Sequence, residues 1–230
     1  VTEEGSFSIV FGAGGLRLIG ALGLVLFCCF YIRRSFDNKE VEFLLSRPIS
    51  RFSFLFSHAS AFAILSLFVS IVIVSIMSFL RVPSTSGLFL WGMSVVSEYI
   101  IITVIALFFS MVLTSAAGSA LATLGFYSLC RMIGTVLGII EVAVDTKTAV
   151  MGSVMKLVSI IIPRFDLMGQ TSWLIYGSEG AAGIKFFAKS NDWIVDFVQN
   201  IGLSGFIILQ TILFVSLFLA ASAYDFYKRE

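Results

Sequence analysis

Charged side chains are scarce in this sequence and make up 13% of its 230 residues. A typical soluble domain carries about 25%. Hydrophobic residues make up 58% of the chain, and the mean hydropathy is +1.02. Because so apolar a surface needs lipid around it, we predict an all-α integral membrane protein. With a net charge of +1, the chain does not have the strong positive field that is typical of nucleic-acid-binding proteins. We therefore expect no nucleic acid as a partner.

Residues that commonly act in catalysis or bind metals are also scarce: the sequence has one histidine and three cysteines. Cys28, Cys29 and Cys130 lie in apolar runs without the spacing of a metal site, so we interpret them as packing residues. The sequence has no phosphate-binding loop, zinc-protease motif or serine nucleophile elbow. We therefore expect no catalytic residue, no metal and no cofactor in this chain, and predict that it is not an enzyme by itself.

A helix that crosses a membrane needs about 20 mainly apolar residues. The segment 150–162 is apolar but shorter and contains Lys156, so we interpret it as a re-entrant or interfacial helix. It belongs to a mixed region, 141–200, whose later part, 163–200, we place at the membrane surface because of its tryptophan and tyrosine residues. Within one transmembrane domain, residues 1–230, the predicted spans are 9–32, 52–80, 88–113, 119–140 and 201–223.

The short connections indicate the orientation of these spans. By the positive-inside rule the most basic connection, 33–51, lies in the cytoplasm. Alternation of the spans then places the N-terminus and the region 141–200 outside and the C-terminus inside. An outside N-terminus without a basic signal segment is awkward for a complete protein, so we expect a further helix before Val1 and six spans in all. The basic residues of the connection are Arg33, Arg34, Lys39, Arg47 and Arg51.

Within this connection, residues 37–46 are predicted to form a short amphipathic helix. Asp37 and Glu40 have the spacing of a capping box, and the apolar residues that follow share one helical face. Pro48 ends the helix. From these residues alone, two roles stay open: an interfacial helix that holds the loop on the membrane, and a helix that docks on a partner protein.

The segment 36–51, FDNKEVEFLLSRPISR, resembles the cytoplasmic loop of ABC-2-type transporter permeases, which has the form D-N-K-T-I-E-x-L-L-S-x-P-I-S-R. Glu40 departs from the threonine of that family. The resemblance implies a multi-pass permease subunit of an ABC transporter in the bacterial cytoplasmic (inner) membrane. It also implies separate ABC ATPase subunits, which bind ATP and Mg, and a second permease subunit in a homo- or heterodimer. The residues implied to dock on the ATPase are Asp37, Glu40, Glu42, Leu44, Leu45, Arg47, Pro48 and Arg51.

The substrate is expected to be lipid-like or amphipathic and to enter from the membrane lipid, because the spans offer no wide polar lining. A function of another class stays open beside transport. In this alternative the chain is a non-transporting membrane scaffold, or an anchor for an assembly complex.

Two charged residues lie deep in consecutive spans. Glu98 and Arg131 are ten and nine residues from the outer ends of their spans, so both lie about 14 Å below the boundary. We predict that they form an intramembrane pair, which either fixes the register of the helices or belongs to a polar translocation path. For His58 we expect snorkelling or a hydrogen bond between helices. The GxxxG pattern at 134–138 indicates close packing.

Overall fold

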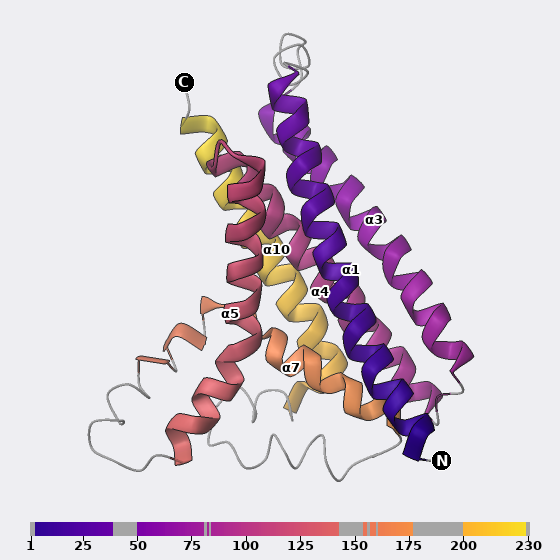
Figure 1. Cartoon of the computed structure of the whole chain (residues 1–230). Coiled ribbons are helices and arrows are strands. Elements are labelled where there is room, and N and C mark those ends of the chain that lie inside the picture. The colour runs from indigo at the N-terminus through magenta and orange to yellow at the C-terminus, as the bar shows by residue number, and fades with distance from the viewer. Residues whose placement is uncertain are drawn as a thin grey trace. The chain divides into compact units, whose positions relative to one another are not determined.

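The computed structural model describes residues 3–38, 50–80, 82, 84–142, 154, 155, 157–159, 161–176 and 200–228. Every regular element in these ranges is helical, and they contain no strand (Figure 1). Five of the helices are long and apolar enough to cross a membrane. The chain is therefore an all-α, multi-pass integral membrane protein, as predicted from its composition.

Each of the five long helices coincides with a predicted span, although their ends differ by a few residues. The largest difference is in the first, which begins six residues earlier and ends five residues later than the predicted 9–32. The long helices are α1 Glu3–Asp37, α3 Arg51–Phe79, α4 Thr85–Val112, α5 Ala116–Val142 and α10 Leu203–Lys228. A short helix, α7 Phe165–Gln170, is followed directly by a 3-10 helix, η1 Thr171–Tyr176.

A serine directly before three of these helices sets where each one begins. The hydroxyl oxygens of Ser50, Ser84 and Ser115 accept hydrogen bonds from the backbone N–H three residues further on, at 3.1, 3.0 and 3.3 Å. The first N–H groups of a helix have no partner inside the helix, and a serine at this position satisfies one of them. These caps explain why α3, α4 and α5 begin within three residues of the predicted starts.

The contacts within the chain divide it into two compact units, whereas the sequence suggested a single domain, 1–230. Each long helix contributes one part to each unit. The first unit consists of Val1–Gly14, Val74–Val95 and Tyr127–Gln210, and the second of Gly15–Ile73, Val96–Phe126 and Thr211–Glu230.

Helix α4 is the most buried of the five candidate spans. Its most apolar stretch is 72% buried, against 28–39% for the other four. Those four expose many large apolar side chains, among them Phe11, Phe68 and Leu121, each at least 64% exposed. Side chains of this kind are stable in contact with lipid, so they favour a membrane around these four helices.

Candidate functional site

The predicted docking loop lies mostly outside the described residues. Helix α1 continues to Asp37, where the sequence prediction placed the first residue of a separate helix at 37–46. The exposed Asp37 carboxylate lies 3.4 Å from Arg33, one turn earlier, and Asn38 N–H donates to Arg34 O at 2.9 Å. Arg51 is the first residue of α3. Glu40, Glu42, Leu44, Leu45, Arg47 and Pro48 are outside the described residues, so their role stays a prediction.

Aromatic rings join α1 and α3 near this loop. The ring of Tyr31 lies 6.3 Å from His58 and 6.1 Å from Phe62, measured between centroids. His58 Nδ1 lies 3.0 Å from Phe54 O, and because a carbonyl oxygen can only accept, Nδ1 carries the hydrogen. The hydrogen bond of His58 is thus within α3. From the sequence we expected snorkelling or a hydrogen bond to another helix.

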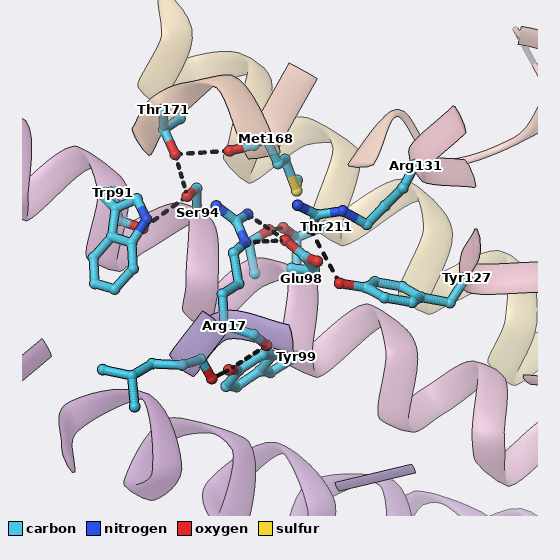
Figure 2. Close-up of polar contacts among 12 residues, drawn as sticks. Arg17, Trp91, Ser94, Glu98, Tyr99, Tyr127, Arg131, Met168, Thr171 and Thr211 are labelled. Atoms are coloured by element: carbon cyan, nitrogen blue, oxygen red, sulfur yellow. Dashed lines mark hydrogen bonds and ion pairs between the residues drawn. The ribbon is translucent and has the colours of Figure 1, made fainter. Parts of the chain in front are cut away.

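A buried ion pair joins α1 to α4 within the second unit. Arg17 Nε donates to Glu98 Oε2 at 2.5 Å, and Nη2 of the same guanidinium pairs with the same oxygen (Figure 2). The two side chains are 1% and 0% exposed. Charges so far from water are stable only when they are paired and hydrogen-bonded, so this contact is a strong constraint on how α1 lies against α4.

Arg17 is a site residue that the sequence prediction missed. It lies eight residues into the predicted span 9–32, at nearly the depth of Glu98 in the span 88–113, so the depth comparison that selected Arg131 also fits Arg17. Arg131 belongs to the first unit and Glu98 to the second. The pair of Glu98 with Arg131 therefore stays a prediction.

Hydroxyl groups surround the Arg17–Glu98 pair. Tyr99 OH donates to the backbone carbonyl of Arg17 at 2.9 Å (Figure 2). Ser66 Oγ, on α3, lies 3.3 Å from Tyr99 O and 3.3 Å from Thr103 Oγ1. Ser97 on α4 forms a hydroxyl contact with Thr211 on α10. In the second unit, three helices therefore bond to the stretch 97–103 of α4.

The first unit holds a second charged cluster, at the start of α7. Arg164 and Asp166 form a bidentate ion pair with contacts of 2.9 Å, and both side chains are 7% exposed. The Asp166 carboxylate lies directly against Gly134 of α5, where an ideal Cβ would be 3.0 Å from Asp166 Cγ. The close packing expected of the GxxxG pattern is therefore formed by Gly134 with the first turn of α7.

Arg131 lies beside this cluster on α5. Its Nη1 donates to Tyr127 OH at 3.1 Å, and its guanidinium carbon is 5.6 Å from the centre of the Tyr127 ring (Figure 2). Tyr127 also packs on Phe165, with 5.6 Å between ring centroids. Arg131 thus presents its charge to an aromatic face, which attracts cations.

The 3-10 helix η1 packs against the first part of α4, while the predicted surface position of 163–200 stays a prediction. Thr171 Oγ1 is 2.7 Å from Ser94 Oγ and donates to Met168 O at 2.7 Å (Figure 2). Ser94 is nine residues into α4, about 14 Å along the helix. Near the start of α4, an ideal Cβ on Gly87 would be only 2.6 Å from the carbonyl carbon of Leu174. The segment 171–174 therefore runs along this part of α4.

The internal pairing of Arg164 with Asp166 allows both charges to be buried. The two opposite charges neutralise each other, and the neighbouring Phe165, Leu167 and Met168 are 0–3% exposed. The pairing offsets part of the cost of removing these charges from water.

Over the part of the chain that the structure describes, no group of three or more histidine, cysteine, aspartate or glutamate side chains could hold a metal ion. Comparison of the chain with protein-family models, with curated proteins and with solved structures finds no match. The function is therefore inferred from the residues themselves.

Proposed function

We propose that this chain is the transmembrane permease subunit of an ABC transporter in the bacterial inner membrane. It has no ATPase activity by itself and works with separate ABC ATPase subunits, which bind ATP and Mg, and with a second permease subunit. The observation that carries the proposal is the resemblance of residues 36–51 to the ATPase-docking loop of ABC-2-type permeases.

The position of this loop supports the proposal. α1 ends at Asp37 and α3 begins at Arg51, so the sequence that resembles a docking loop directly connects two candidate membrane spans. Movement of such a loop acts on both helix ends at once, which is what a permease needs to turn ATP-driven closure into movement of its spans. The five basic residues of 33–51 favour the cytoplasmic side, where ATP is available.

The substrate that fits this chain best is a lipid-like or amphipathic molecule. The buried polar side chains described above bond to one another: Arg17 to Glu98, Arg164 to Asp166, and Ser94 to Thr171. The outer faces of the helices are apolar, with large exposed side chains. A molecule that is mostly apolar can reach the protein sideways through the lipid, at little cost in desolvation.

Co-purification tests the proposal. The tagged chain, extracted from its native membrane in mild detergent, should bring down an ATPase that carries a phosphate-binding loop, identified by mass spectrometry. Leu44→Asp with Leu45→Asp should remove that ATPase, because two carboxylates would have to be buried in an apolar docking surface. The folded chain should still be recovered in the same yield.

A matched control places the same two charges on the other connection that the topology puts in the cytoplasm. Thr114→Asp with Ala117→Asp changes two exposed residues, one in the connection between α4 and α5 and one in the first turn of α5, and should leave the ATPase bound. A native chain that purifies without any ATPase would favour the scaffold alternative over transport. Loss of the ATPase in both double variants would show that added charge alone weakens the complex, and would contradict docking through Leu44 and Leu45.

A further inference from the structure

The two helices that flank the predicted docking loop bond to the same short stretch of α4. We call this stretch the α4 junction and define it by Glu98, Tyr99 and Thr103, all in the second unit. α1, which ends at the loop, reaches the junction through Arg17. The Arg17 side chain pairs with Glu98, and its backbone carbonyl accepts the Tyr99 hydroxyl at 2.9 Å (Figure 2).

α3, which begins after the loop, reaches the junction through Ser66. Its hydroxyl donates to Phe62 O in its own helix at 2.8 Å and lies 3.3 Å from both Tyr99 O and Thr103 Oγ1. Ser66 is 0% exposed, so water does not compete for these contacts. Tyr99 therefore contacts α1 with its side chain and α3 with its backbone.

Nearer the loop, α1 and α3 contact each other. Tyr31, whose ring meets those of His58 and Phe62, lies six residues before Asp37, about 9 Å along α1. Arg17 lies twenty residues before Asp37, about 30 Å along the same helix. α1 therefore contacts α3 close to the loop, and it contacts α4 further along the helix, away from the loop.

A glycine keeps α1 close to the junction. An ideal Cβ at Gly20 would lie 2.8 Å from Tyr99 Cζ and 2.9 Å from Ile73 Cδ1, and closer still to the Tyr99 hydroxyl. At Gly23, one turn along α1, an added Cβ would meet nothing within 4 Å. Gly20 therefore allows the approach that brings Tyr99 OH within bonding distance of the backbone of α1.

We propose that the α4 junction receives the movement of the docking loop, so that residues 15–37 of α1, 51–73 of α3 and 96–112 of α4, all in the second unit, move together as one rigid body. This inference rests on the proposed function, which supplies the ATPase that moves the loop. Tyr99 and Ser66 are positioning residues: they hold both loop-flanking helices on one buried helix, so a displacement at the cytoplasmic end is carried to the middle of the membrane.

Distances between spin labels test this rigid body. Cysteines for labelling replace Phe30 on α1, Leu67 on α3 and Leu113 directly after α4; the first two are 54% and 45% exposed. The native cysteines are 0% exposed and do not compete for the label. The measurement is made on the complex with its co-purified ATPase in lipid nanodiscs. The 30–113 distance should have the same value without nucleotide as with ADP and vanadate trapped, and so should the 67–113 distance.

The test variant is Tyr99→Phe with Ser66→Ala, which removes the hydroxyls of these two residues and leaves the loop and the Arg17–Glu98 pair intact. The ATPase should still co-purify, but the 67–113 distance should now change on trapping, because Ser66 carries the described contacts of α3 with the junction. The matched control is Tyr224→Phe with Ser60→Ala, since Tyr224 is 71% exposed and Ser60 bonds only within its own helix in the described contacts. The control should keep both distances constant.

A second pair of variants tests the junction without nucleotide. Gly20→Ala should broaden the 30–113 distance distribution, whereas Gly23→Ala should leave it unchanged. Equal widths in these two variants would overturn the junction itself. Two results would contradict the proposal that the junction receives the movement of the loop. One is a change of either distance on trapping in the native complex, and the other is a constant 67–113 distance in Tyr99→Phe with Ser66→Ala. Absence of an ATPase would instead overturn the proposed function and the transmission with it, while the glycine pair still reports on the junction.

Discussion

The buried ion pair of Arg17 and Glu98 gives the sharpest prediction about stability. Replacing either residue by glutamine leaves the other charge buried, since the side chains are 1% and 0% exposed. Removal of one partner from a buried pair typically costs about 3–5 kcal/mol. At about 2–4 °C per kcal/mol for a chain of this size, each single variant should melt roughly 6–20 °C lower than the native protein.

Thermal unfolding in detergent, followed by the loss of the monodisperse peak in size-exclusion chromatography, measures this effect. The double variant Arg17→Gln with Glu98→Gln has no unpaired charge, so it should be destabilised by about 0.5–3 kcal/mol less than the sum of the single variants. A pair in contact with solvent, the half-buried Arg33 and the exposed Asp37, serves as the control, and its loss should cost at most about 1 kcal/mol. Strict additivity of the Arg17 and Glu98 variants would refute the pairing.

Two further predictions use the same melting assay. Gly134→Ala should destabilise the protein by about 1–3 kcal/mol because the added methyl overlaps the Asp166 carboxylate, whereas Gly125→Ala, in open space, should stabilise it by up to about 1 kcal/mol. Equal effects would contradict the packing of α5 on the first turn of α7. Glu98→Gln and Arg131→Gln should be non-additive if these two residues pair as their depth predicts. Additivity would leave Arg17 as the partner of Glu98 and Tyr127 as that of Arg131.

The spans were predictable because membrane helices are read from length and hydropathy alone. Lipid offers no hydrogen bonds, so a long apolar segment has to satisfy its backbone as a helix, whatever its neighbours are. The helix ends were less predictable. Polar residues can continue a helix beyond the apolar run, as Arg33 and Asp37 do by pairing one turn apart at the end of α1.

The polar contacts inside the membrane were only partly predictable. Depth arithmetic selected Glu98 correctly as a residue that needs a partner, but two arginines, Arg17 and Arg131, lie at a similar depth, and depth does not say which helices are neighbours. The contacts of α7 with α5 and of η1 with α4 were not predicted. Which helix faces meet depends on tertiary packing, and only the fold places Gly134 of α5 against the Asp166 carboxylate.

The scarcity of charge by itself determined that this protein is an all-α membrane protein, because the hydrophobic effect acts on each segment according to its own composition. The sequence also singled out the segment 36–51, on which the proposed function rests. Only the tertiary structure decided that Arg17 of α1 meets Glu98 and that Ser66 of α3 meets Tyr99. It also decided that α4, which carries Glu98 and Tyr99, is the most buried of the candidate spans. Such contacts depend on which faces of which helices pack together, and every apolar helix here offers several faces that lipid and protein could cover equally well.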